Sequence, residues 1–130
     1  MAKLERQHLE FLEQPFVGVV TTLRADGSPH NTVVWIDVDD GKPSFNTARG
    51  RAKVNHLERD PRAAVTVVDP NDPYKWLAID GRAQLTTDDA DEQIDKLAFK
   101  YEGRESFDRP AEQIRLKVRI TPDHVTAYGF

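Results

Sequence analysis

The sequence contains no cysteine, which excludes disulfide bonds and thiolate chemistry. It also has no apolar run long enough to span a membrane, and its N-terminus lacks the apolar core of a secretory signal. We therefore expect a cytoplasmic protein without a thiol-based site.

The motifs of the common catalytic chemistries are absent as well. There is no GxGxxG or Walker phosphate loop, and none of Ser28, Ser44 and Ser106 stands in the context of a nucleophile elbow. The 4 histidines show no spacing typical of metal ligands. The sequence therefore predicts no catalytic side chain and no metal site. Either a bound cofactor carries the chemistry, or the protein only binds a ligand.

The chain is short and slightly acidic. Its 130 residues predict a single domain over the whole range 1–130, and a formal net charge of −4 argues against nucleic acid as the main partner. Hydrophobic residues make up only 38% of the chain, so the core is small for this length. We therefore expect part of the surface to be buried against a second copy of the chain.

Turn signals and hydrophobic periodicity predict a mainly β protein with short helices. Asp26-Gly27 and Asp40-Gly41 are hairpin signals, and Gly81 inside a long strand predicts a bulge. About six strands with early hairpins fit a small antiparallel barrel. We expect helices at 3–13, 51–60 and 88–101, and strands at 16–23, 30–37, 43–47, 63–69, 75–86, 114–120 and 125–130.

Two of these strands carry finer expectations. The segment 16–23, FVGVVTTL, is almost uninterrupted in its hydrophobicity, which is typical of a strand buried on both faces. The segment 114–120, IRLKVRI, alternates apolar and charged residues, which is typical of a half-exposed strand. Pro122 should end that strand.

The segment 45–61, FNTARGRAKVNHLERDP, holds the clearest sign of a ligand. Arg49, Arg51 and Lys53 crowd the start of its helix, where the backbone dipole is already positive, whereas Glu58 and Asp60 stand at its end. The helix at 88–101 has the favourable arrangement, with acids first and lysines last. A bound anion, most simply a phosphate, would turn this repulsion into a binding site. The alternative is that these charges are solvated surface residues.

Two stretches of the chain resemble a known family. TTLRADGSPHNTVVW, followed by FNTARGRAKVNHLERDPRAAVTVVD, is similar to the split β-barrel flavin and deazaflavin oxidoreductases related to pyridoxamine 5′-phosphate oxidase. The similarity is greatest to the actinobacterial branch that binds the deazaflavin coenzyme F420. The resemblance covers nearly the whole chain and implies a six-stranded antiparallel split β-barrel of the FMN-binding type.

The resemblance also implies a cofactor site in a groove between two subunits of a homodimer. Arg51 and Lys53 would hold the cofactor phosphate, and Arg49 could meet an acidic tail. Trp76 would come from the other subunit, with a core or dimer-interface role as the alternative, and Trp35 would either line the groove or pack within the barrel. The full set of cofactor-binding candidates is His30, Thr32, Val33, Val34, Asn46, Thr47, Arg49, Arg51, Ala52, Lys53 and Trp76.

The function that the resemblance implies is an F420H2-dependent reductase. Such an enzyme would pass hydride to a conjugated acceptor such as a quinone, an enone or a tetrapyrrole. One alternative is an FMN-dependent oxidoreductase like pyridoxamine phosphate oxidase. The other is a non-catalytic protein that carries or senses a flavin or deazaflavin.

Overall fold

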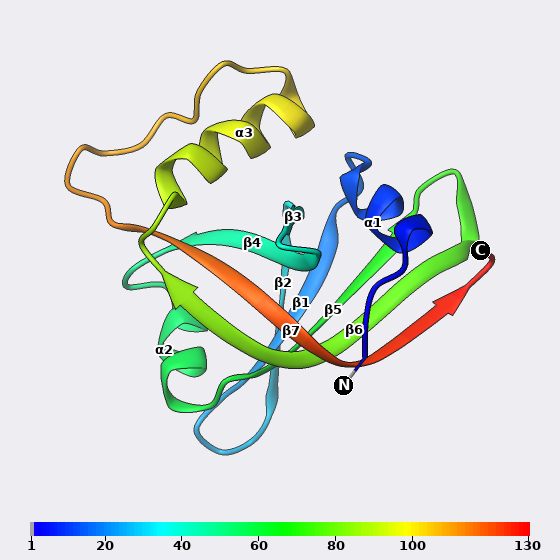
Figure 1. Ribbon diagram of the computed structural model, residues 1–130. Coiled ribbons are helices and arrows are strands. Elements are labelled where there is room, and N and C mark those ends of the chain that lie inside the picture. Colours follow the sequence, from blue (N-terminus) through cyan, green and yellow to red (C-terminus); the bar gives the residue numbers. More distant parts are fainter. Residues whose placement is uncertain (1) are drawn as a thin grey trace.

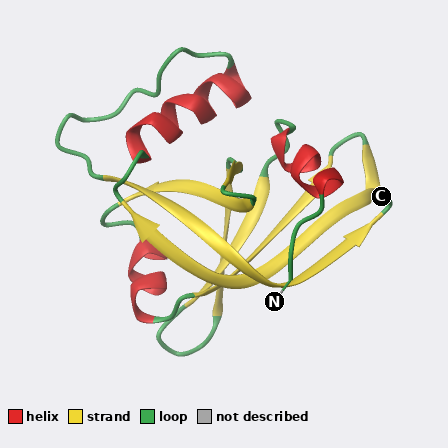
Figure 2. Ribbon diagram, in the orientation of Figure 1, coloured by secondary structure: helices red, strands yellow, loops and turns green. Residues whose placement is uncertain are grey.

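One antiparallel sheet of seven strands dominates the computed structural model, which describes residues 2–130 (Figures 1 and 2). The spatial order of the strands is β2-β1-β5-β6-β7-β4-β3. Along the chain the elements are α1 (Arg6–Glu13), β1 (Gly18–Leu23), β2 (Pro29–Val34), β3 (Asp37–Asp39), β4 (Lys42–Ala48), α2 (Ala52–Arg59), β5 (Arg62–Asp69), β6 (Asp72–Thr86), α3 (Ala90–Glu102) and β7 (Arg115–Tyr128).

The predicted mainly β fold is confirmed, but the expected number of six strands is wrong. Residues 37–39 form a separate short strand, β3, beside β4. The outer strands of the sheet are β2 and β3, so backbone pairing does not close the barrel. The longest strands, β6 and β7, pair with each other and curve across the whole molecule (Figure 1). They therefore join the two halves of the sheet.

The predicted bulge at Gly81 is confirmed, and it explains why the predicted strand break at Pro122 is wrong. Strand β7 runs without interruption to Tyr128, and Pro122 pairs opposite Gly81 beside a register shift. A proline needs no ladder N–H at such an irregular position. A Cβ atom on Gly81 would lie 1.9 Å from the carbonyl oxygen of Thr121, so only glycine allows this close approach.

Both predicted hairpin turns are confirmed. The Asp26 carboxylate accepts hydrogen bonds from the N–H of Ser28 at 2.9 Å and from its hydroxyl at 2.6 Å. In the second turn, Asp40 and Gly41 have φ values of 54° and 71°. Two positive values in succession are typical of the type I′ turn that joins tightly paired strands.

The two finer expectations about strand burial are wrong. In β1, Gly18 and Val20 are buried, but Val19 is 42% exposed because nothing within residues 2–130 covers its side of the strand. In β7, Arg115 and Lys117 are buried rather than exposed. Pairing with β4 places these two cations beneath other parts of the chain, where they find polar partners.

The three helices pack against different parts of the sheet. Helix α3 packs on β4 and β7, whereas α2 contacts β1 on the other side of the molecule (Figure 1). The core lies within the curved sheet, and its fully buried side chains include Leu12, Val20, Ile36, Phe45, Val65, Leu77, Ile79, Val118 and Ile120. No helix within residues 2–130 is long and apolar enough to cross a membrane.

Candidate functional site

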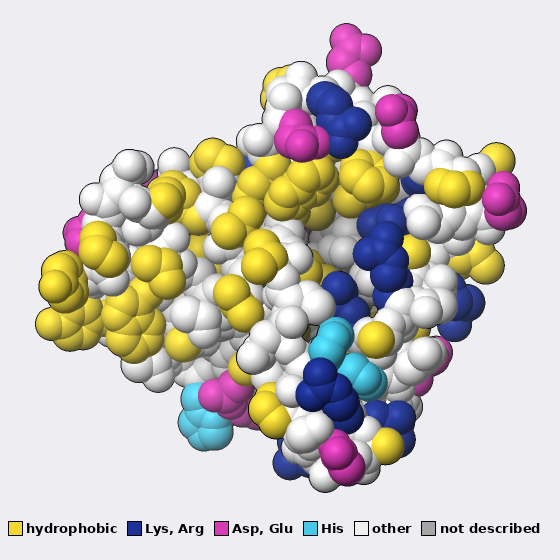
Figure 3. All heavy atoms as spheres, turned by 180° about the vertical axis from the view of Figure 1, so that it is seen from behind, with side chains coloured by type: hydrophobic (Ala, Val, Ile, Leu, Met, Phe, Trp, Pro, Cys, Tyr) yellow, Lys and Arg dark blue, Asp and Glu magenta, His cyan; other side chains and the backbone are white. Residues whose placement is uncertain are grey.

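A groove of about 230 Å³ opens between α2, α3 and the ends of β2, β4 and β7. Figure 3 shows it as a hollow where Lys and Arg side chains meet hydrophobic ones. Most of the predicted cofactor-binding residues come together around it. The lining residues are Val17, Val33, Val34, Trp35, Asn46, Thr47, Arg51, Lys53, Ile94, Leu97, Phe107 and Arg115.

The first turn of α2 supplies free hydrogen-bond donors to this groove. Gly50, with φ 97°, turns the chain from β4 into the helix, and Arg51 is the N-cap residue without a side-chain cap. Within residues 2–130, the N–H groups of Ala52 and Lys53 donate to no acceptor. Unpaired N–H groups at a helix N-terminus attract an anion.

Lys53 is a buried cation with no anionic partner within residues 2–130. It is 9% exposed. Burial, and then the nearby charges of Arg51 and Arg115, hold its pKa below the usual value. A buried ammonium group beside two guanidinium groups is unfavourable unless a negative charge joins them.

Arg115 is the charged residue of the groove that the sequence analysis missed, and Phe107 is the aromatic one. Arg115 is 6% exposed, and its Nε donates to Asn46 Oδ1 at 2.8 Å. Its guanidinium lies 5.3 Å from the centre of the Phe107 ring. Burial, followed by the charge of Arg51, lowers its pKa. Its local pattern is the same as that of Arg119, so the sequence offered no signal to separate the two.

The groove is therefore electropositive without internal compensation. No carboxylate of residues 2–130 forms an ion pair with Arg51, Lys53 or Arg115. The predicted misplacement of charge holds at the start of α2, whose first turn has no acid, in contrast to α3. At the other end, Glu58 and the C-cap residue Asp60 stand where they were expected, but Arg59 lies between them in the last turn and offsets part of their charge.

Three buried polar atoms within residues 2–130 have no hydrogen-bond partner, and all belong to predicted cofactor-binding residues. They are Nδ1 of His30, Oγ1 of Thr32 and Oγ1 of Thr47. Buried polar atoms are nearly always paired in native proteins, so such orphans mark places where a ligand is expected. His30 and Thr32 share one face of β2 with Val34, which lines the groove.

Five of the predicted residues do not line the groove, namely His30, Thr32, Arg49, Ala52 and Trp76. The Arg49 side chain lies 3.5 Å from Glu58, with both side chains half exposed. Ala52 can contribute only its backbone N–H. Trp76 stacks on Tyr128 with ring centres 6.0 Å apart, far along β6 from the bulge at Gly81. The role of these residues toward a cofactor stays a prediction.

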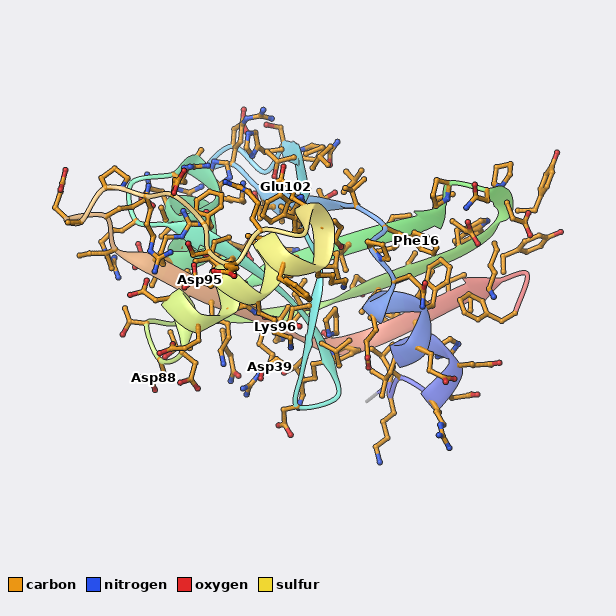
Figure 4. All side chains as sticks on the ribbon, turned by 90° about the horizontal axis from the view of Figure 1, so that it is seen from above. Phe16, Asp39, Asp88, Asp95, Lys96 and Glu102 are labelled. Atoms are coloured by element: carbon orange, nitrogen blue, oxygen red, sulfur yellow. The ribbon has the colours of Figure 1, made fainter. Side chains whose placement is uncertain are left out.

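Aromatic side chains form a wall of the groove beside the cations. Trp35 both lines the groove and packs inside the protein, because it stacks on Tyr101 at 5.4 Å between ring centres. Phe107 meets the Trp35 ring edge-on at 6.1 Å. The Asp95 carboxylate, on the side of α3 that faces the loop 103–114 (Figure 4), accepts the N–H of Phe107 at 2.9 Å. The wall is thus held in place by α3.

This arrangement can hold an anionic group next to a flat apolar ring system. Among residues 2–130, no Asp, Glu or His side chain lines the groove. A reaction here would therefore rely on the chemistry of a bound cofactor and on positioning by the protein.

The chain is similar to known oxidoreductases. Residues 4–129 match the sequence profile described as pyridoxamine 5′-phosphate oxidase. An F420H2-dependent biliverdin reductase from Mycobacterium tuberculosis is 33% identical over 91 residues, which are 66% of this chain and 62% of that protein. The chain thus spans less than two thirds of the length of this curated relative.

Solved structures share the fold. A structure described as an F420 reductase superposes with a TM-score of 0.82 and 25% identity, covering 95% of this chain and 98% of the other. A conserved hypothetical protein from Mycobacterium tuberculosis superposes with a TM-score of 0.76 and 22% identity, covering 98% and 86%. Since the profile match extends over almost the whole sequence, the chain belongs to the pyridoxamine 5′-phosphate oxidase family.

Proposed function

We propose that this protein is an F420H2-dependent reductase that passes hydride to a conjugated small-molecule acceptor. The observation that carries the proposal is the set of three buried or groove-lining cations, Arg51, Lys53 and Arg115, which have no carboxylate partner beside an aromatic wall. The similarity to an F420H2-dependent biliverdin reductase and to an F420 reductase supports the choice of cofactor.

The residues of the groove fit the parts of such a cofactor. Arg51, Lys53 and the free N–H groups at the start of α2 would hold the phosphate diester. The orphan hydroxyls of Thr32 and Thr47 would pair with the polar edge of the ring system. When bound, the deazaflavin supplies the hydride. The protein orients the ring and keeps its open face accessible, and a proton comes from solvent or from the substrate.

We propose a flat, conjugated acceptor because the remaining groove surface is apolar and aromatic. Val33, Trp35 and Phe107 would face the acceptor, and none of them can donate or accept a proton. A quinone, an enone and a tetrapyrrole are the acceptor classes to compare. Each class is mixed with the protein and F420H2, and the absorbance of F420H2 is recorded over time. The class that causes this absorbance to disappear is the substrate class.

We also propose that the site is completed by a second copy of the chain. Val17 and Val33 line the groove yet are 50% and 67% exposed. Strand pairing places exposed Val19, Val68 and Tyr128 on the same face of the sheet as Val33. Figure 3 shows hydrophobic side chains spread over the surface beside the groove. The groove volume of about 230 Å³ in one chain is also below the range of roughly 300–1,000 Å³ that is usual for ligand pockets. A two-fold dimer would cover the apolar face and enclose the groove.

Cofactor titrations test this proposal. The fluorescence of F420 and of FMN should be followed with the purified protein at low and high salt. We expect tighter binding of F420, and weaker binding at high salt because mobile ions screen the exposed charges. Tighter binding of FMN, or FMN that co-purifies in stoichiometric amount, would assign the protein to the FMN-dependent alternative. Tight binding of F420 without turnover of any acceptor would favour a carrier.

Light scattering tests the dimer separately. A mass of about twice the chain mass of 14.8 kDa is expected at micromolar concentration. A monomer that still binds the cofactor tightly would contradict the shared site.

A further inference from the structure

Two histidines meet beside the groove, at the junction of α2 with the β1–β2 hairpin. The rings of His30 and His56 contact each other edge to face, with centres 5.0 Å apart. Nδ1 of His56 lies 2.9 Å from Oγ1 of the buried Thr22, which fixes the ring. Nδ1 of His30 is buried and has no hydrogen-bond partner in the part of the chain that the structure describes. One polar atom of this pair is thus still available to a ligand.

Two arginines flank the histidine pair, and their backbone contacts keep them there. Arg24 donates to the carbonyl oxygen of Pro29 at 2.5 Å, and Arg59 donates to that of Leu23 at 3.2 Å. The guanidinium groups are not neutralised by these carbonyls. Figure 3 shows histidine side chains next to Lys and Arg side chains on the face that carries the groove.

The neighbouring acids are bound to other residues. Glu58, on the same helix, lies 3.5 Å from Arg49, and Asp60 binds Arg62 at 2.8 Å. Asp26, which lies near Arg24 in the β1–β2 turn, accepts hydrogen bonds from the N–H and the hydroxyl of Ser28. The groups that face His56 are Thr22 and Arg24 from the first strand and its turn, His30 from β2, and Arg59 from α2. Arg24, His30 and Arg59 each disfavour the protonated, positively charged form of His56.

The cluster continues the electropositive groove along two elements. Helix α2 carries Lys53 in the groove and His56 in the cluster, and three residues advance a helix by about 4.5 Å. Strand β2 carries Val34 in the groove and His30 in the cluster, with the unpaired hydroxyl of Thr32 between them. A ligand bound at Lys53 could therefore extend into the cluster without leaving the protein surface.

We propose that Arg24, His30, His56 and Arg59 form a second anion site, which takes up an oxyanion together with a proton. The oxyanion is a carboxylate or a phosphate-type group, either free or as the outer acidic part of the ligand in the groove. If the oxyanion belongs to the ligand in the groove, the proposal rests on the proposed function. The existence of a second anion site does not depend on that function.

The sign of the pH dependence follows from the surroundings of His56. Burial, then His30, Arg59 and Arg24, hold the pKa of His56 below its usual value of 6.5. A bound anion adds an opposing charge and raises that pKa, so anion binding and proton uptake favour each other. If the pKa rises by about one unit, the anion binds about tenfold more tightly at low pH than at high pH.

Histidine NMR tests the site without any cofactor. The C2–H resonances of the 4 histidines are followed from pH 5 to 8.5 with sodium sulfate or sodium glutarate, and with sodium chloride at equal ionic strength. We expect sulfate and glutarate to raise the pKa of His56 and to move the His30 resonance saturably, while His8 and His124 keep their titration curves. An equal effect of chloride, or equal shifts of all four resonances, would overturn the proposal.

Two variants sharpen this measurement. Arg59→Gln should abolish the effect of sulfate on His56. Arg62→Gln is the matched control, because Arg62 lies on the same segment but is bound to Asp60. It should leave the effect intact. If Arg59→Gln responds to sulfate as the wild type does, the second anion site is wrong.

The cofactor experiment separates the two sources of the oxyanion. F420, which ends in a glutamate tail, is titrated into wild type and His56→Asn between pH 6 and 8, and the fold of each is checked by circular dichroism. If the tail occupies the cluster, wild type gains affinity at pH 6, by less than the tenfold that a one-unit pKa shift gives once His56 is fully protonated, and the variant gains none. Equal pH dependence in both proteins would exclude the tail. If wild type binds no F420, the proposed function fails, and the sulfate experiment still decides on the site.

Discussion

Asn46 holds Arg115 in the groove. Its Oδ1 accepts the Nε–H of Arg115 at 2.8 Å, and its Nδ2 donates to the carbonyl oxygen of Ala90 and to Oε1 of Gln93 at 2.8 and 3.0 Å. One side chain thus connects β4, β7 and the start of α3. Asn46 was expected beside the cofactor phosphate, and its contacts indicate that it acts there through Arg115.

Asn46→Ala should weaken both the fold and anion binding. It removes the hydrogen-bond partner of the Arg115 Nε–H and of Gln93 Oε1, and one donor to the carbonyl oxygen of Ala90. An unsatisfied buried polar group costs about 1–3 kcal/mol. We expect a lower denaturation midpoint in urea and weaker cofactor binding. Asn31→Ala is the control, because Asn31 is exposed on β2 and pairs only with Thr21. If Asn46→Ala changed no more than this control, Arg115 would not depend on Asn46.

Lys53→Ala should separate binding from stability. Loss of a charged hydrogen bond should weaken cofactor binding by roughly 1.5–3 kcal/mol. The empty protein should be equally stable or more stable, because a buried cation next to Arg51 and Arg115 is removed. Titration of the cofactor and urea denaturation of the empty protein measure the two effects. A less stable protein with unchanged affinity would make Lys53 a structural residue.

Gly81→Ala should destabilise the sheet at the bulge. The added Cβ would lie 1.9 Å from a backbone oxygen of Thr121, and backbone cannot move aside as a flexible side chain can. Overpacking of this kind costs roughly 1–3 kcal/mol or more. Gly27→Ala is the control, because its φ is 85° but no atom lies within 4 Å of the added group. Thermal unfolding should show a larger loss for Gly81→Ala.

Stability should pass through a maximum at alkaline pH. Burial lowers the pKa of Lys100 to about 8, so the unfolded chain binds more protons above that pH, and stability rises up to the unfolded value of 10.5. Burial raises the pKa of Tyr101 to about 12, so its contribution is present below pH 10.0 and is lost as the pH approaches 12. Urea denaturation at pH 7 to 12 would measure both slopes.

Lys100→Met should remove only the increase in stability between pH 8 and 10.5. Nζ of Lys100 donates to the carbonyl oxygens of Leu12 and Ile36, so the variant also loses two hydrogen bonds, but that loss does not vary between pH 8 and 10.5. The decline above pH 10 should remain. If the variant kept the rise, another group would be responsible for it.

The chemistry of single residues was sufficient to predict the turns, the bulge at Gly81 and the cations at the start of α2. Asp40-Gly41 adopts positive φ and Gly81 accepts a close backbone approach because these properties belong to the residues themselves. The cluster of Arg51 and Lys53 at a helix start was likewise visible, since the backbone dipole depends only on the helix. Sequence patterns also gave the main strands, although residues 37–39 became an additional one.

Tertiary structure alone decided which charged residues are buried. Arg115 and Arg119 alternate identically with apolar neighbours and both pair with β4. Only their tertiary partners separate them, because Asn46 holds Arg115 in the groove whereas Asp39 binds Arg119. The exposure of Val19 and the contact of His30 with His56 are also long-range results. The alternation of residues along a strand predicts which side chains share a face. Which segments cover that face depends on parts of the chain that are far away in the sequence.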